Sequence, residues 1–190
     1  NRAGRMLARA KNPIRIGVIV QSVETMFMHT VFEEIERASA HFTTTGAEVL
    51  VRPLEGVDAQ QQLDVIDELL EAGVQGIALS PAEDERVRAR IQELSERMPV
   101  VTFNSDLPDS RRLCFVGQDI YKAGQVAGGL MSRCIPAGSQ LLATVGNLKF
   151  DGHRQRLAGF RDRIREAGFP MEDLVVAETC LLYTSPSPRD

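Results

Sequence analysis

The stretch Ile14-Arg-Ile-Gly-Val-Ile-Val20, followed directly by Gln21 and Ser22, decides the fold class of this chain. It is a short apolar run, which predicts a strand. In the next segment, 25–42, apolar residues recur at three- or four-residue spacing, which predicts a helix. A strand that leads into a helix is the opening half of a βαβ unit.

The same alternation continues along the chain. Further strands are predicted at 47–51, 76–79, 100–103, 113–116, 140–145 and 174–177. Further helices are predicted between Asp58 and Gly73 and at 83–97, 121–134 and 152–167. Asp58 is a suitable N-cap, and glycines at positions 46, 73 and 168 are suitable helix stops. Strands that alternate with helices predict right-handed crossovers and a mainly parallel sheet, which is an α/β fold.

Length and composition exclude some classes of protein. The 190 residues suffice for one or two domains, and the 43% hydrophobic and 25% charged content is ordinary for a soluble globular protein. No apolar run approaches the roughly 20 residues of a membrane span, so no membrane partner is expected. The run at 16–20 is too short for a signal peptide, although the chain does not begin with Met and an upstream signal is left open. The cysteines at 114, 134 and 180 lack metal-ligand spacing, which is typical of reduced thiols in a cytoplasmic protein.

The chain lacks the common catalytic motifs. There is no Gly-x-Gly-x-x-Gly after the first strand, no Gly-x-x-x-x-Gly-Lys-Ser/Thr and no Gly-x-Ser-x-Gly. His29, His41 and His153 are not spaced as a metal set. We therefore expect a protein that is not an enzyme, with no catalytic residue, metal or cofactor. An α/β enzyme with an unrecognised site, using Asp106 and Asp119 as an acid–base pair, is the weakest alternative.

Residues 179–190 break the alternation. Two Ser-Pro pairs stand where the next helix is expected, and each proline disfavours helix at the residue before it. The segment 181–190 also resembles translated sequencing-adaptor read-through. We interpret 179–190 as a non-native tail, with a natural proline-rich terminus as the alternative.

The loops after the predicted strands are rich in hydrogen-bonding groups. Ligands of parallel α/β sheets bind outside the carboxyl ends of the strands. Here these ends carry hydroxyls, amides and carboxylates, with aromatic rings at Phe27 and Phe150. This mixture suits a neutral, hydroxyl-rich small molecule. The loops concerned are 21–29, 80–82, 104–108, 117–119 and 146–154.

Five motifs occur in an order that resembles a known fold. They are Ile16-Gly-Val-Ile-Val-Gln-Ser22, Val74-Gln-Gly-Ile-Ala-Leu-Ser-Pro81, Pro99-Val-Val-Thr-Phe-Asn-Ser-Asp106, Phe115-Val-Gly-Gln-Asp-Ile-Tyr-Lys-Ala-Gly124 and Gly152-His-Arg-Gln-Arg-Leu-Ala-Gly-Phe-Arg161. Together they resemble the type I periplasmic-binding-protein fold, which sugar-binding proteins of ABC importers share with lac-repressor-type (LacI/GalR) regulators. The resemblance implies two Rossmann-like lobes with parallel sheets flanked by helices. The first lobe would span 14–118, and an incomplete second lobe 119–178.

The resemblance also implies ligand contacts. The residues that match the family's contact positions are Thr25, Phe27, Asn104, Ser105, Asp106 and Arg154. Asn104 stands where the family most often has an aspartate that binds sugar hydroxyls, so hydrogen bonding is kept and a charge is lost. Structural alternatives are a hydrophobic plug for Phe27, a turn former for Asp106 and a surface helix residue for Arg154.

A basic arm precedes the first strand. The first 15 residues hold five cations and no acid, whereas the other 175 hold 17 basic and 26 acidic side chains. The segment Asn1-Arg-Ala-Gly-Arg-Met-Leu-Ala8 resembles the hinge of LacI/GalR regulators, which assigns residues 1–13 to a DNA-proximal arm. The resemblance implies that Leu7 enters the minor groove while Arg2 and Arg5 lie near phosphates.

Two functional hypotheses follow from the resemblance. The first is the effector-binding domain of a cytoplasmic LacI-type regulator, homodimeric at full length, whose lobes close on a sugar-like effector and alter operator DNA affinity. The operator-reading helix-turn-helix would lie outside this chain. The alternative is a periplasmic sugar-binding protein of an ABC importer. The arm favours the regulator.

Overall fold

The structure is a computed structural model that describes residues 13–42, 46–136, 138–146, 148 and 150–178. Arg2, Arg5 and Leu7 of the predicted arm, and the predicted tail at 179–190, lie outside the described residues. The described residues form two compact units that divide between Gly117 and Gln118. None of the helices in the described part of the chain is long and apolar enough to span a lipid bilayer.

A five-stranded parallel sheet forms the first unit, in the order β2-β1-β3-β4-β5. The strands are β1 (Ile14–Val20), β2 (Ala47–Pro53), β3 (Gly76–Leu79), β4 (Val100–Phe103) and β5 (Cys114–Val116). The helices are α1 (Met26–Phe42), α2 (Ala59–Glu71) and α3 (Glu85–Ser95). The predicted α/β fold and alternation are confirmed. β2 continues to Pro53, which is compatible with its place at the sheet edge.

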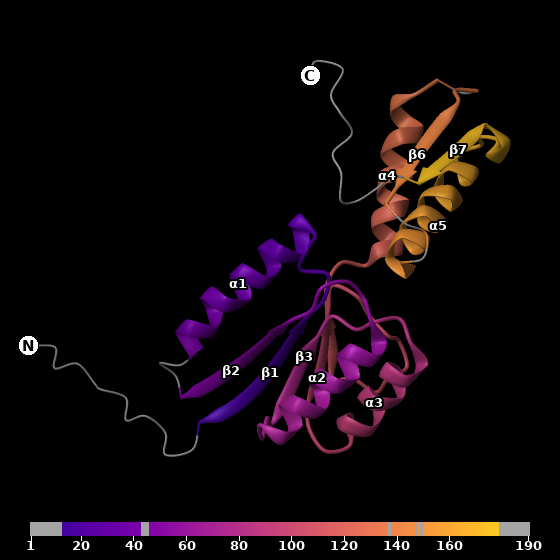
Figure 1. Ribbon diagram of the computed structural model, residues 1–190. Coiled ribbons are helices and arrows are strands. Elements are labelled where there is room, and N and C mark those ends of the chain that lie inside the picture. The colour runs from indigo at the N-terminus through magenta and orange to yellow at the C-terminus, as the bar shows by residue number, and fades with distance from the viewer. Residues whose placement is uncertain (1–12, 43–45, 137, 147, 149, 179–190) are drawn as a thin grey trace, which may run out of the picture. The chain divides into compact units, whose positions relative to one another are not determined.

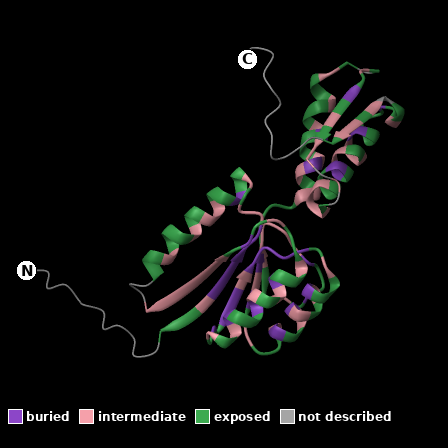
Figure 2. Ribbon diagram, viewed as in Figure 1, coloured by how far each residue is buried: buried purple, intermediate pink, exposed green. Residues whose placement is uncertain are grey.

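The two faces of this sheet are covered unequally. Figure 1 shows α1 on one face and α2 with α3 on the other. On the α2 and α3 face, thirteen buried apolar residues form one cluster, centred on Ile19, Ile66 and Ile91. On the α1 face the buried residues of the cluster are Val18, Val20 and Met28. The purple, buried positions of Figure 2 follow this division. The dense core therefore lies between the sheet and α2 with α3.

The helix ends follow the predicted local chemistry. The Asp58 carboxylate accepts the backbone N–H of Gln61 at 2.7 Å, so the predicted N-cap of α2 is confirmed. Gly46, Gly73 and Gly168 have φ of 89°, 76° and 86°, the left-handed region in which glycine carries no Cβ penalty. Gly73 and Gly168 directly follow the C-caps of α2 and α5, as predicted for helix stops. Gly46 directly precedes β2, and residues 43–45 between it and α1 lie outside the described residues.

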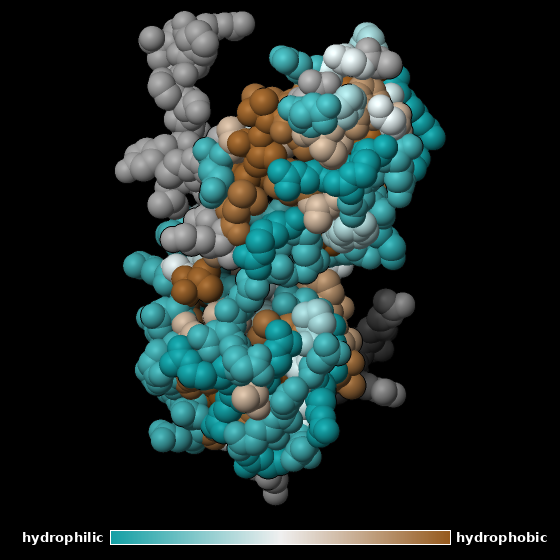
Figure 3. All heavy atoms as spheres, turned by 90° about the vertical axis from the view of Figure 1, so that its right-hand side faces the viewer, coloured by the Kyte–Doolittle hydropathy of each residue, from teal (hydrophilic) through white to brown (hydrophobic). Residues whose placement is uncertain are grey.

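The second unit contains two parallel strands and two helices. They are α4 (Ile120–Cys134), β6 (Leu141–Val145), α5 (Asp151–Glu166) and β7 (Leu174–Glu178), with a 3₁₀ turn at Met171–Asp173. Large apolar side chains remain on its surface, and Figure 3 shows apolar, brown side chains gathered on this unit. The exposed residues are Val126, Leu130, Met131, Leu142, Phe150 and Val175.

Glycines let α4 and α5 approach closely. A Cβ on Gly124 would lie 2.0 Å from the Arg156 carbonyl oxygen, and one on Gly159 would lie 2.1 Å from the Tyr121 carbonyl oxygen. Both obstacles are backbone atoms, which cannot rotate away. The tyrosine hydroxyl also donates to Asp162 at 2.7 Å across the same contact. The small residues of α4 thus serve packing within the unit.

We expect Gly159→Ala to lower the free energy of unfolding of the second unit by about 1–3 kcal/mol, because the new methyl group forces the helices apart. Amide hydrogen exchange of α5 measures this effect locally. Gly152→Ala is the matched control in the same helix, since no atom lies within 4 Å of its added Cβ. Equal protection in both variants would contradict the packing assignment.

Candidate ligand-binding edge

The carboxyl ends of β1, β3 and β4 lie next to one another, because these strands are neighbours in a parallel sheet. Thr25 lies in the loop after β1, and Phe27 lies in the first turn of α1 that follows this loop. The loop after β4 holds Asn104, Ser105 and Asp106, and these segments form, with the loop after β3, the edge considered below. Arg154 belongs to the second unit. Metal-ligand groups of three or more His, Cys, Asp or Glu are absent from the described residues.

Thr25 shapes the turn between β1 and α1. Its hydroxyl donates to the Ser22 carbonyl at 2.8 Å and accepts the Met28 N–H at 3.4 Å. Thr25 is therefore the N-cap of α1. Ser22 itself has φ of 56° and is held by its backbone and hydroxyl hydrogen bonds to the Gly56 carbonyl, at 3.0 and 3.2 Å. The turn after β1 is thus fixed by several local bonds.

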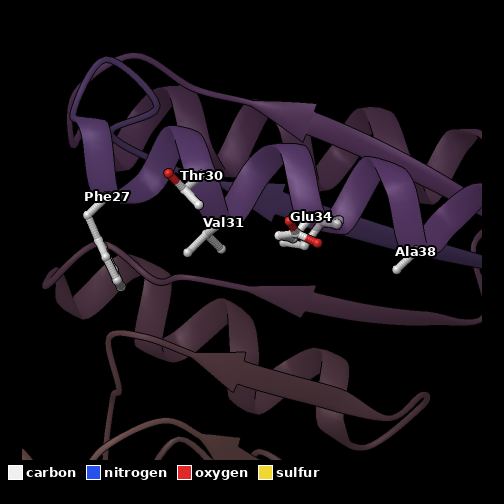
Figure 4. A pocket seen from close by; sticks show the side chains of 6 residues that line it. Phe27, Thr30, Val31, Glu34 and Ala38 are labelled. Carbon is white, nitrogen blue, oxygen red and sulfur yellow. The ribbon is translucent and has the colours of Figure 1, made fainter.

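Phe27 lies in the first turn of α1 and is 64% exposed. Figure 4 shows Phe27 at one end of a row of α1 side chains, with Val31 further along and Ala38 at the far end. These residues line a hollow on the flank of this helix. The hollow has a volume of about 340 Å³, and Thr30, Glu34 and Ile35 complete its lining. An exposed aromatic face of this kind suits contact with C–H surface.

Two buried glutamines hold the loop after β3. The Gln62 amide donates to the Ser80 carbonyl at 3.0 Å and accepts the Ala82 N–H at 2.8 Å. The Gln21 amide donates to the Pro81 carbonyl at 3.0 Å and to the Ser80 hydroxyl at 3.4 Å. Gln21 Oε1 is buried and has no hydrogen-bond partner among the described residues. An acceptor of this kind at the sheet edge is available to a ligand or a water molecule.

These glutamines were not predicted as site residues. Gln62 lies on the same buried helix face as Ile66 and Leu69. A polar residue within this apolar stripe is the sequence feature that indicates a buried hydrogen-bonding role. Gln21 directly follows β1, and its position in the sequence does not show that its side-chain oxygen remains unpaired.

Asn104 turns the chain at the end of β4. Its φ is 60°, a conformation that asparagine adopts more readily than most residues. Its N–H donates to the Val116 carbonyl at 3.1 Å, and the Ser105 N–H donates to the Phe103 carbonyl at 2.7 Å. Both side chains are half-buried. The loop thus presents an amide and a hydroxyl in succession.

The Asp106 carboxylate is already bound within the loop. Arg112 donates to both of its oxygens at 2.5 Å, and the Thr102 hydroxyl donates to Oδ1 at 2.7 Å. This hydrogen bond to Asp106 raises the pKa of the Arg112 guanidinium. Asp119, the other carboxylate considered for acid–base chemistry, caps α4 by accepting the Lys122 N–H at 3.0 Å.

Arg154 lies in the first turn of α5, beside other charged groups. Its guanidinium donates to the Leu148 carbonyl at 3.0 Å and to Asp151 Oδ1 at 3.1 Å. Together with residues of α5 and β7 it lines a groove of about 600 Å³. The other lining residues are Leu148, Leu157, Ala158, Arg161, Asp162, Arg165, Val176 and Glu178.

His153 supports the loop before α5. Its Nδ1 accepts the Gly146 N–H at 3.2 Å, and its ring lies 5.9 Å from the Phe150 ring, between centroids. Burial, reinforced by the positive charge of Arg156, lowers the pKa of His153. The neutral ring is therefore the form that fits the folded structure, because a proton on Nδ1 would remove the acceptor.

We expect the second unit to lose stability as the pH falls through the ordinary histidine pKa of about 6.5. The folded-state pKa lies lower, so the unfolded chain binds the proton first, and stability is complete only above that pH. Urea unfolding between pH 5 and 8 measures the effect. His153→Asn keeps an acceptor near Nδ1 and cannot titrate, so it should flatten this part of the profile; an unchanged profile would refute the assignment.

Comparisons with known proteins agree with the parallel α/β fold. A family profile described as "Periplasmic binding protein domain" matches residues 16–184. GanP, a glucose-galactose binding protein from Geobacillus stearothermophilus, is 23% identical with a TM-score of 0.72, over 88% of this chain and 59% of that chain. The XylFII molecule is 25% identical with a TM-score of 0.71, over 87% and 59%.

A third similar structure is the fructose-binding periplasmic domain of a hybrid two-component system. It is 21% identical with a TM-score of 0.71, over 87% of this chain and 54% of that chain. Among curated proteins, no sequence matches. The chain thus spans between half and two thirds of the length of these structures. Its sequence match and its parallel α/β architecture show that the chain belongs to the periplasmic binding protein domain family, with the type I fold.

Proposed function

We propose that this chain binds a sugar or sugar-like small molecule at the carboxyl edge of its first sheet. The observation that carries the proposal is the chemistry of that edge. Asn104 and Ser105 supply an amide and a hydroxyl, the Gln21 side chain supplies an unpaired acceptor, and Phe27 supplies an exposed ring. Amides and hydroxyls pair with ligand hydroxyls, and an aromatic ring covers C–H groups.

The charge at this edge supports a neutral ligand. The Asp106 carboxylate is paired with Arg112, so its charge is compensated within the loop. The residue before Ser105 is an asparagine, where the resembling family most often has an aspartate. Hydroxyl groups satisfy such a surface without bringing a charge of their own. Arg154 of the second unit is the proposed contact from the other lobe.

We propose the effector-binding domain of a LacI-type regulator as the setting of this site. Its support is the cationic arm that precedes an acidic body. Sugar binding would shift the populations of open and closed lobes, and through them the affinity for operator DNA. Such a protein would act in the cytoplasm, as a homodimer at full length.

A sugar-binding receptor for import or sensing is the second candidate. The names of the similar structures favour it, since they include a glucose-galactose binding protein and a fructose-binding periplasmic domain. Sequencing the native gene upstream of Asn1 separates the two candidates. A helix-turn-helix segment there supports the regulator, and an export signal supports the receptor.

We expect Asn104→Gly to weaken sugar binding about tenfold, because one or two hydrogen bonds to the ligand are lost. Glycine keeps the positive φ of this position, so the backbone is preserved. Isothermal titration with D-glucose, D-galactose, D-fructose and D-arabinose measures the affinity. Asn104→Ala, the comparison variant, should also lower stability through backbone strain. Wild-type affinity in the glycine variant would show that the amide does not contact the sugar.

We expect the chain to bind duplex DNA weakly and without sequence preference through residues 1–12. The slope of log K against log salt should be roughly −3, because about three arginines of the arm replace counterions. Fluorescence anisotropy at several salt concentrations measures this slope. A chain that begins at Pro13 is the control and should not bind. Equal binding by both chains would remove the main support for the regulator.

A further inference from the structure

The loop 104–113 connects two neighbouring parallel strands without a helix. It contains three non-glycine residues at positive φ: Asn104 at 60°, Asp109 at 66° and Arg111 at 58°. Such conformations are sparsely populated and persist where the surrounding contacts over-determine them. Some interaction must therefore hold this loop in its observed shape.

Asp106 and Arg112 form an ion pair within this loop. The guanidinium meets the carboxylate with two bonds of 2.5 Å, and the fully buried Thr102 donates a third at 2.7 Å. The two charged side chains are only 20% and 23% exposed. Two-bond pairing with limited exposure fixes direction as well as distance, unlike an ordinary surface pair. We call this pair and Thr102 the loop clasp.

Helix α3 holds the middle of the same loop. Gln92 donates to the Asp109 carbonyl at 2.9 Å, and Arg88 donates to the Pro108 carbonyl. These bonds tie residues 108 and 109 to a helix that packs in the dense core. The loop clasp holds the two ends of the loop together, because it joins residue 106 near the start of the loop to residue 112 near its end.

We infer that Asp106 and Arg112 are positioning residues for ligand binding by the first unit. The clasp holds the turn in which Asn104 and Ser105 offer their side chains, and it removes the Asp106 carboxylate from contact with ligand. The inference rests on the proposed sugar-binding function. A loop held in its binding conformation loses less freedom when the ligand binds, and a loop that opens lowers the apparent affinity by the fraction that stays closed.

The test compares Arg112→Met with Arg111→Met in the full chain. Arg111 is the matched control, because its pair with Glu96 spans 3.2 Å between side chains that are 68% and 65% exposed. The first readout is hydrogen exchange of the Asn104 N–H, which reports the turn directly through its bond to Val116. The second is the affinity for D-glucose, D-galactose, D-fructose and D-arabinose.

We expect Arg112→Met to speed exchange at Asn104 at least about tenfold and to weaken sugar binding by a similar factor, as for loss of a charged hydrogen bond. Arg111→Met should change neither. Arg112→Lys keeps the charge without the two-bond geometry, so it should fall between them, and it replaces the methionine variant if that variant does not fold.

Unchanged exchange at Asn104 in the Arg112 variants would overturn the clasp. Faster exchange with unchanged sugar affinity would overturn its positioning role. If wild-type chain binds none of the four sugars while exchange still responds to Arg112 alone, the clasp stands and the proposed sugar-binding function fails. In the double variant Asp106→Asn with Arg112→Met, the loss of sugar affinity should be smaller than the sum of the losses in the two single variants, because the two sites share one interaction.

Discussion

Parallel pairing of β1 on both of its edges is the constraint on which the rest of the first unit depends. β2 and β3 satisfy its backbone along both sides, and Ile19 and Val20 within it are fully buried. A strand buried on both faces and both edges cannot shift its register without exposing apolar side chains. Since all five strands run the same way, every loop that follows a strand is delivered to the same edge.

The unequal covering of the sheet gives this edge a firm support. The residues of the cluster under α2 and α3 are buried, and polar side chains of these same helices contact the loops. The Gln62 side chain on α2 donates a hydrogen bond to the loop after β3, and the Gln92 side chain on α3 donates one to the loop after β4. The α1 face is packed less completely, so its partly buried residues, such as Phe103, remain open to further contacts.

Some polar side chains at this edge are used in hydrogen bonds within the protein, and others remain available to a ligand. Thr25 caps α1, and Asp106 is taken up by Arg112. Gln21 Oε1 is left without a hydrogen-bond partner among the described residues. Binding of a neutral, hydroxyl-rich molecule is the chemistry that uses such groups.

Sequence by itself determined the order and type of the elements, because these follow from local signals. The apolar run at Ile14–Val20, the cap at Asp58 and the stop at Gly73 act over a few residues, and the structure confirms each. The alternation of strands and helices predicted that the loops after the parallel strands of the first unit lie at the carboxyl edge of its sheet. Only the tertiary structure decided which side chains pair there. The glutamine bonds, the loop clasp and the glycine contact of α4 with α5 join residues whose distance is set by packing, and a one-dimensional pattern carries no such distances.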